Sequence, residues 1–461
     1  MNASQAKTDI VKRIQRMRPG TFVILSFLAA AIIGGALLAL PAASTSDPVA
    51  PLDAFFTAVS AVCVTGLVVV DTGTQFTAFG KGVILFLIQL GGLGVMTFSV
   101  FLFLFLGKGL GTKGRWIVTE TFTAAPIREI RKLLWSIFGV TFALEAIGAV
   151  LLFWVWRGEM PLGEALFASV FHAVSSFCNA GFSFFSTSFI AWRDSILLNA
   201  TVICLIVAGG LGFPVIYEVR TRLRARREGI RAQWSFHTKL VISTTAILLI
   251  GGTALICLLE WRGALAGLPL RSRVLASLFQ SVTARTAGFN TLDIPALQPA
   301  TLFIIVMLMF VGASPGSTGG GIKTTSLAVF AAIFFNRFRG RESVSVFKRT
   351  VPAETVTRAL SIIGLAAVTI TTGLVLLLVF HMGASEPGSN EFLVFLFEAV
   401  SAFGTVGLSM GATPALSAGG KVVVIVLMLL GRVGLLTVAY VVTRRERYRR
   451  FRYAEEKVMI G

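Results

Sequence analysis

Four short stretches of the sequence share one pattern, in which a glycine follows residues with short side chains and precedes Leu or Phe. They are Val64-Thr65-Gly66-Leu67, Asn179-Ala180-Gly181-Phe182, Thr286-Ala287-Gly288-Phe289 and Thr405-Val406-Gly407-Leu408. Glycine reaches, at low steric cost, backbone angles that turn successive carbonyl groups to one side. Rings of backbone carbonyls can replace the hydration shell of a metal cation. These four stretches, here called the glycine turns, therefore indicate coordination of a cation by backbone oxygens.

Each glycine turn lies between a short apolar segment and a longer one. The short segments cover residues 52–62, 163–177, 273–284 and 391–403. A helix needs about 20 apolar residues to cross the hydrocarbon core, so we expect these segments to be half-helices that enter the membrane and end at the turns. Their carboxyl ends carry the negative pole of the helix dipole, which favours a cation. The alternative is that each glycine only lets helices pack closely.

The composition is that of a membrane protein. The chain has 461 residues, of which 55% are hydrophobic and 14% charged, and its mean hydropathy is +0.83. A long apolar segment precedes each half-helix and another follows each turn. We therefore expect an all-α integral membrane protein, with eight spans and four re-entrant pore loops in four pseudo-symmetric repeats around a central pore. The repeats are expected at residues 1–132, 133–236, 237–354 and 355–461.

The net charge of +19 reflects membrane topology. Most of the 41 Lys and Arg residues lie in the amino-terminal segment, in the loops after the second span of each repeat and in the carboxyl-terminal tail. By the positive-inside rule these regions are cytoplasmic. We therefore expect a multi-pass protein of the bacterial plasma membrane with cytoplasmic termini. Such charges also suit contact with membrane lipids, and their distribution argues against nucleic-acid binding.

The four turns together resemble those of the Trk/Ktr/HKT superfamily of potassium transporters, in particular the Ktr membrane subunit, over essentially the whole chain. The resemblance implies a gated, channel-like pore for potassium uptake, a homodimer with one pore in each subunit, and a cytosolic nucleotide-binding regulatory ring of the Ktr A type. The implied selectivity filter consists of the glycines and the two residues before each of them: Val64, Thr65 and Gly66; Asn179, Ala180 and Gly181; Thr286, Ala287 and Gly288; Thr405, Val406 and Gly407.

Each turn has one such glycine, where tetrameric potassium channels have two, so we expect looser discrimination between cations. In the plant branch of the superfamily, a serine in place of the first filter glycine accompanies sodium transport. This chain has glycine in all four turns, which favours potassium. Sodium is expected to permeate less well or to act as an activator, and the sequence leaves open whether it is coupled, activating or neutral.

The second span of the third repeat is interrupted by a stretch that no helix could run through, since it holds a proline and five glycines. Irregular backbone inside the membrane is tolerated where it lines a pore, so we expect this stretch to be a gate. The predicted gate residues are Gly312, Ser314, Pro315, Gly316, Thr318, Gly319, Gly320, Gly321 and, in the fourth repeat, Arg432. The matching points of the other repeats predict continuous or kinked helices. Because Ile322 separates the last glycine from Lys323, the stretch does not match a phosphate-binding loop.

Two arginines at membrane depth need an explanation, because a charge there is costly and usually faces a cavity or a partner. Arg432 is expected to raise an electrostatic barrier to cations beneath the turns, or else to form a salt bridge or cap backbone carbonyls. Arg285, just before the third glycine turn, is expected to pair with Glu398 of the fourth half-helix. Glu145 stays unassigned.

Two other function classes fit the sequence less well. Secondary transporters with inverted repeats would alternate the direction of their repeats, whereas all four half-helices are expected to enter from outside. A membrane-embedded enzyme would need a metal cluster, paired carboxylates or a nucleophile with a base. The spans predict none of these, and the four cysteines (Cys63, Cys178, Cys204, Cys257) lack metal-ligand spacing.

Overall fold

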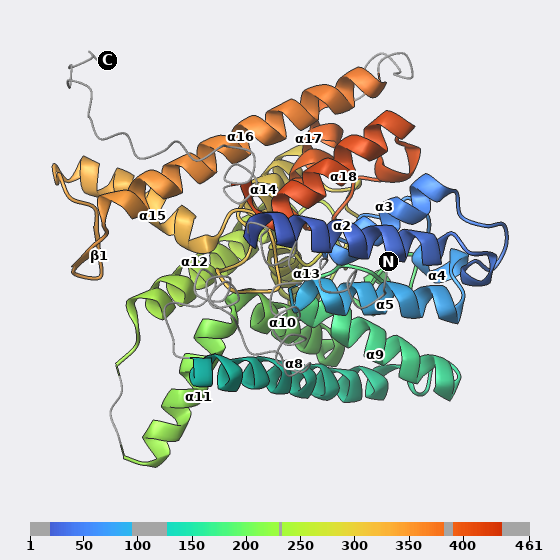
Figure 1. The fold of residues 1–461 in the computed structure, drawn as a ribbon, viewed down its shortest axis with the longest axis horizontal. Coiled ribbons are helices and arrows are strands. Elements are labelled where there is room, and N and C mark those ends of the chain that lie inside the picture. Colours follow the sequence, from blue (N-terminus) through green and yellow to red (C-terminus); the bar gives the residue numbers. More distant parts are fainter. Residues whose placement is uncertain (1–18, 95–126, 230–232, 382–390, 436–461) are drawn as a thin grey trace, which may run out of the picture.

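Helices make up almost all regular structure in the residues that the computed structural model describes, which are 19–94, 127–229, 233–381 and 391–435. The mostly helical architecture expected from the sequence is thus confirmed. Most of the long helices lie side by side along one direction (Figure 1). The basic amino-terminal segment, residues 95–126 with part of the first basic loop, and the carboxyl-terminal tail lie outside the described residues.

The helices follow one another in a recurring order: a first helix, a half-helix, a glycine turn and a further helix. The first helices are α2 (Pro19–Leu38), α8 (Ile127–Trp156), α12 (Phe236–Leu259) and α16 (Ala353–His381). The half-helices are α3 (Pro51–Val62), α9 (Leu162–Cys178), α13 (Leu270–Thr283) and α17 (Glu391–Gly404). The helices after the turns are α5 (Ala78–Gly92), α10 (Ile196–Leu211), α14 (Pro299–Phe310) and α18 (Ala418–Val433).

Shorter elements connect or extend these helices. They are η1 (Pro41–Ala43), α4 (Thr72–Gln75), η2 (Ile190–Trp192), α11 (Phe213–Arg227), α15 (Thr324–Phe338), η3 (Thr413–Ala415) and the strands β1 (Ser345–Val346) and β2 (Arg349–Thr350). The two strands form an antiparallel hairpin between α15 and α16. This hairpin departs from the all-α expectation: Phe347 and Lys348 between its strands both have positive φ, as a tight two-residue turn requires.

Three described helices are long and apolar enough to cross a membrane: Trp135–Trp156 within α8, then α12 and α16. A fourth candidate is the pair formed by α10 and α11, which is bent by 102°. The bend lies at Gly212, whose φ is +89°. It is much sharper than the continuous or kinked helix predicted there, and it turns α11 away from the parallel helices (Figure 1).

Glycines let the helix after a turn pack directly against the end of a half-helix. A Cβ added at Gly91 of α5 would collide with the carbonyl oxygen of Val62, the last residue of α3. Gly209 of α10 and Gly431 of α18 have the same relation to the half-helices α9 and α17. This backbone-to-backbone contact holds the carboxyl ends of the half-helices deep in the bundle.

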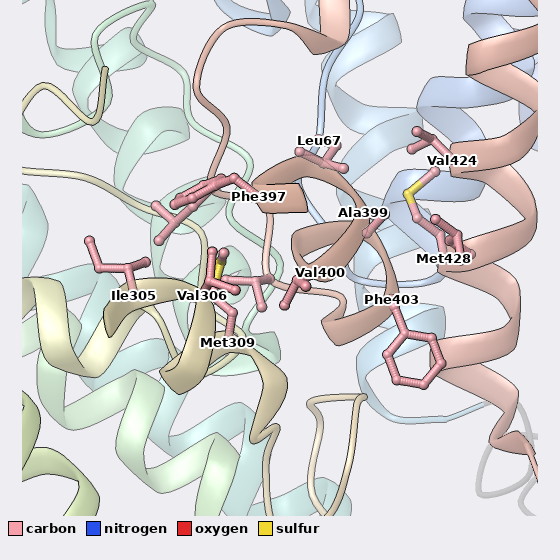
Figure 2. Packing of buried hydrophobic residues seen from close by; sticks show 14 of the residues in the cluster. Leu67, Ile305, Val306, Met309, Phe397, Ala399, Val400, Phe403, Val424 and Met428 are labelled. Carbon is pink, nitrogen blue, oxygen red and sulfur yellow. The ribbon is translucent and has the colours of Figure 1, made fainter. Parts of the chain in front are cut away.

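The fourth half-helix, α17, shows how apolar packing fixes these segments. Figure 2 shows Val306 and Met309 of α14 on one side of α17, and Val424 and Met428 of α18 on the other. All four side chains are buried, and Phe403 near the end of α17 is 3% exposed. Burial of large apolar side chains stabilises a site by about 1.5–3 kcal/mol each, so α17 is held firmly although it is too short to span.

Replacing Gly91 by Ala tests the close packing of α5 on α3. We expect the thermal midpoint of the purified protein to fall by several degrees, because an overpacked contact costs about 1–3 kcal/mol. The matched control is Gly82→Ala in the same helix, where no atom lies within 4 Å of an added Cβ. An equal midpoint for the two variants would contradict the packing argument.

Candidate functional site

The four glycine turns close into a ring in chain order. A Cβ on Gly66 would lie 2.9 Å from the Cα of Gly181, and one on Gly181 would lie 3.0 Å from the Cα of Gly288. A Cβ on Gly288 would lie 3.2 Å from the Cα of Gly407, and one on Gly407 would lie 3.1 Å from the Cα of Gly66. Any side chain at these positions would therefore strike the backbone of the next turn.

The backbone of each turn alternates between left-handed and ordinary angles. The glycines have φ between 69° and 92°, and the residue two before each glycine also has positive φ: Val64, Asn179, Thr286 and Thr405, at 51–73°. Such angles cost a non-glycine residue about 1–3 kcal/mol, so they persist only where the surroundings enforce them. Their recurrence in all four turns gives the ring one repeated backbone shape.

Carbonyl oxygens approach the neighbouring glycine around the ring. A Cβ on Gly181 would lie 2.9 Å from the carbonyl oxygen of Ala287. The carbonyl oxygens of Ala180, Val406 and Thr65 have the same relation to Gly66, Gly288 and Gly407. Each turn thus places one main-chain oxygen against the glycine of its neighbour in the ring, with no side chain between them. Such a set of oxygens suits a cation that has lost its water.

Hydroxyl groups at the ends of the half-helices tie the turns in place. Ser60 Oγ accepts a hydrogen bond from Gly66 N at 3.1 Å, and Ser401 Oγ accepts one from Gly407 N at 3.1 Å. Ser175 Oγ donates to the carbonyl of Phe182 at 2.9 Å. The sequence analysis missed these serines, although each stands six residues before the glycine of its turn, a regularity that could have revealed them.

The third turn is built differently. Its half-helix ends at Thr283, whose hydroxyl donates to the carbonyl of Phe289 at 2.6 Å, and the serine of the other three turns has no counterpart six residues before Gly288. The longer connection accommodates Arg285, which is only 7% exposed. The Arg285 Nε has no hydrogen-bond partner in the structure.

The expected pair between Arg285 and Glu398 is not formed. None of the ion pairs among the described residues joins them. The Glu398 carboxylate instead accepts hydrogen bonds from Ser409 Oγ at 2.5 Å, Thr413 Oγ1 at 2.6 Å and the backbone N of Met410 at 3.0 Å. Hydroxyl and amide donors satisfy this buried carboxylate, so it needs no arginine and braces the chain that follows the fourth turn.

Asn179 joins the second turn to the third. With the amide nitrogen directed at the carbonyls of Ile206 and Ser176, the side-chain oxygen accepts a hydrogen bond from Thr286 Oγ1 at 3.2 Å. This orientation is preferred because the opposite one leaves the amide oxygen facing only acceptors. The contact fixes both residues at their left-handed positions.

One side of the ring opens into a cavity of about 370 Å³. All four glycines line it, together with Asp71, Asp293 and several hydroxyl and amide side chains. The two carboxylates in this cavity suit a hydrated cation that approaches the ring.

The interrupted stretch between α14 and α15 lies against the other side of the ring. Gly320 N donates to Thr405 Oγ1 at 3.1 Å, and Thr318 Oγ1 donates to the carbonyl of Phe177 at 3.2 Å. A Cβ on Gly319 would collide with Thr286 Oγ1. The stretch therefore touches the second, third and fourth repeats directly beneath their turns.

Bonds to the helices on either side hold the stretch in this position. Ser314 N donates to Gly210 O at 3.0 Å, and Gly321 N donates to Gly431 O at 3.3 Å. Gly312 packs so closely on Gly320 that a Cβ there would meet its carbonyl oxygen. Pro315 and Gly316 rest against the bend at Gly212.

Arg432 bridges the stretch to the first repeat. Its guanidinium donates to the carbonyl oxygens of Thr318 and of Gly91. Of the roles considered for Arg432 in the sequence analysis, this geometry is the capping of backbone carbonyls. Lys323, which the sequence analysis did not assign to the gate, donates through Nζ to Gly319 O at 2.8 Å. Two cationic side chains thus bind backbone carbonyls of the same short segment beneath the ring.

Comparison with known proteins places this geometry in a family. Residues 7–449 match the family model TrkH, described as cation transport protein. The chain belongs to the TrkH family. This membership also confirms that the protein is a transporter and not an enzyme, and, with its apolar helices, that it is a multi-pass membrane protein.

Curated relatives match over nearly their full length. The chain is 37% identical to the Ktr system potassium uptake protein B of Bacillus subtilis, covering 99% of both chains. It is 40% identical to the protein of the same name from Vibrio alginolyticus, over 95% of this chain and 94% of the relative. The potassium/sodium uptake protein NtpJ of Enterococcus hirae is 36% identical, over 98% of this chain and 100% of the relative.

The crystal structure of the potassium transporter TrkH from Vibrio parahaemolyticus has the same fold. Its TM-score is 0.72 at 18% sequence identity, covering 93% of this chain and 86% of that structure. At this sequence identity, the structural similarity shows a shared fold only.

Replacing Ser401 by Ala tests the role of the serine hydroxyl groups that bind the backbone of the turns. The change leaves the N–H of Gly407 without its buried partner, which costs about 1–3 kcal/mol. We expect the ratio of potassium to sodium flux in proteoliposomes to fall several-fold.

The control is Ser243→Ala in α12, whose hydroxyl bonds only to Leu240 of its own helix at 3.1 Å. This variant should keep the flux ratio of the unmodified protein. If Ser401→Ala also keeps it, the hydroxyl does not shape the turn in the way argued here.

Proposed function

We propose that the protein takes up potassium ions through the ring of glycine turns. The observation that carries the proposal is the closed ring of four glycine turns, each with a carbonyl oxygen against the glycine of its neighbour. The carboxyl ends of α3, α9, α13 and α17 stand next to the turns, and their dipoles favour a cation. Two of the relatives described above are named as potassium uptake proteins, and a third as a potassium/sodium uptake protein.

The energy for uptake would come from the membrane potential across the bacterial plasma membrane. The potential supplies about 2.3 kcal/mol per charge at 100 mV. That corresponds to roughly fifty-fold accumulation of a monovalent cation, since 1.4 kcal/mol is a factor of about ten. With cytoplasmic termini, as the basic loops favour, the cavity that holds Asp71 and Asp293 would face outward and collect the ion.

The interrupted stretch and Arg432 would form the gate. The stretch lies beneath the ring, and Arg432 holds its Thr318 carbonyl against the first repeat. The positive charges of Arg432 and Lys323 would oppose a cation that leaves the ring inward. Movement of the stretch away from the turns would open the path.

A cytosolic partner could reach this gate through α11. Phe213 N, at the start of α11, donates to the carbonyl oxygen of Gly316 in the stretch at 2.9 Å. The same helix carries Arg220, Arg224 and Arg227 on an exposed face. We infer that a nucleotide-binding ring docks on the arginine-rich cytoplasmic side, that subunits pair as a homodimer, and that a pull on α11 moves the stretch.

The first test is ion flux in proteoliposomes. The purified protein should carry potassium and rubidium faster than sodium. Gly66→Ser should raise sodium flux relative to potassium several-fold, because a side chain there meets the carbonyl oxygen of Ala180 and spoils the ring. Faster sodium than potassium flux in the unmodified protein would overturn the assignment of potassium as the substrate.

The gate is tested by two changes that act on one contact from opposite sides. Arg432→Ala and deletion of residues 316–320 should each raise potassium flux without the partner, by removing the barrier or the plug. Arg271→Ala, an exposed residue at the start of α13, is the control and should leave flux unchanged. Unchanged or lower flux in both folded gate variants would contradict the gate.

A further inference from the structure

Glu145 is a buried carboxyl group that the transport path does not use. It lies at the middle of the candidate span Trp135–Trp156 and is 5% exposed. Ionisable residues at membrane depth normally face a partner or a cavity. Glu145 Oε2 accepts one hydrogen bond from Gln89 Nε2, at 3.4 Å, and Oε1 lies 3.9 Å from Cys178 Sγ. Among the ion pairs of the described residues, none involves this carboxylate.

The carboxyl group lines a crevice of about 500 Å³ between α5, α8 and α9. Apart from Gln89 and Glu145, its walls are apolar or glycine: Gly82, Leu85, Phe86, Phe142, Ala146, Ala149, Val170 and Val174. Phe86 is 62% exposed and Phe142 is 54% exposed. These rings mark the mouth of the crevice on the outer, apolar surface of the helices, which in a multi-pass protein contacts acyl chains.

We propose that this crevice binds an amphiphile with a single apolar chain and a primary ammonium group. The ammonium would pair with Glu145 and donate to Gln89 Oε1, while the chain would lie between Phe86 and Phe142. A carboxylate accepts hydrogen bonds only, and in surroundings of low polarity it gains most from a positively charged donor. The volume matches that of a small-molecule site, about 300–1,000 Å³.

An amine fits the depth of the site as well as its charge. Glu145 lies at mid-span, beyond the reach of phospholipid head groups at the membrane surface. An alkylamine crosses hydrocarbon as the neutral base, takes the proton of the protonated Glu145 carboxyl group and binds here as the ammonium beside the resulting carboxylate, whereas a quaternary ammonium keeps its charge and cannot shed it on the way. The site should therefore prefer primary alkylamines to alcohols and to quaternary analogues of the same chain length.

Photolabelling of the purified protein in lipid nanodiscs tests this proposal independently of transport. A photoreactive dodecylamine should label peptides of α5 and α8, and unlabelled dodecylamine should compete at least ten times better than dodecanol or dodecyltrimethylammonium. Glu145→Gln should reduce labelling about ten-fold. Asp194→Asn, at an exposed carboxylate, should leave labelling unchanged.

A second variant separates loss of the site from loss of the fold. Ala146→Phe fills the crevice from an exposed position on α8 while keeping the carboxyl group, and it should also reduce labelling. Equal competition by dodecanol, or full labelling of a folded Glu145→Gln protein, would overturn the proposal. If the protein failed to carry potassium, the labelling result would still decide the question of the crevice.

Discussion

A cation that crosses a membrane must find oxygen ligands to replace its water, and here the backbone itself must supply them. Main-chain oxygens from four turns can come together only if no side chains lie between the turns. Gly66, Gly181, Gly288 and Gly407 meet this condition, since a Cβ on any one of them would strike the backbone of the next turn. The rest of the structure holds these four turns at one level.

Two kinds of contact hold them there. Glycines of the following helices, such as Gly91 and Gly431, let backbone pack against the ends of the half-helices. Hydroxyl groups of Ser60, Ser175 and Ser401 then bind the turns to those ends. The first contact sets the depth of each turn, and the second enforces backbone angles that would otherwise be unfavourable.

The elements of the proposed gate are less symmetrical than the ring of glycine turns. The third repeat has the longer turn with Arg285, and the stretch that interrupts its second helix binds the second and fourth repeats. Arg432, which donates to the Thr318 carbonyl of the stretch, also donates to the carbonyl of Gly91 in the first repeat. The stretch itself contacts the second, third and fourth repeats and is linked to the first through Arg432, so its displacement would act on the whole ring at once.

The sequence predicts the helices and the ring better than the contacts around them. The four half-helices follow from apolar segments too short to span, and the glycines at their ends mark the turns. The predicted Arg285–Glu398 pair was wrong because three nearby donors, Ser409, Met410 and Thr413, satisfy the carboxylate locally. A charge pattern alone could not reveal these, since hydroxyl donors carry no charge.

The bend at Gly212 was also underestimated. A glycine in a helix permits either a kink or a break, and the choice here depends on the distant Pro315–Gly316 segment that packs against it. Lys323 was missed because its partner is a backbone carbonyl, which leaves no signature in the sequence. The serines that bind the turns were also missed, although their constant spacing of six residues before the glycine could have revealed them.

Anomalous diffraction from crystals grown in rubidium tests the central claim most directly. The account predicts an anomalous peak on the axis of the ring, at bonding distance from the carbonyl oxygens of Thr65, Ala180, Ala287 and Val406. A rubidium peak elsewhere along the path, with none at this level of a well-ordered ring, would contradict it.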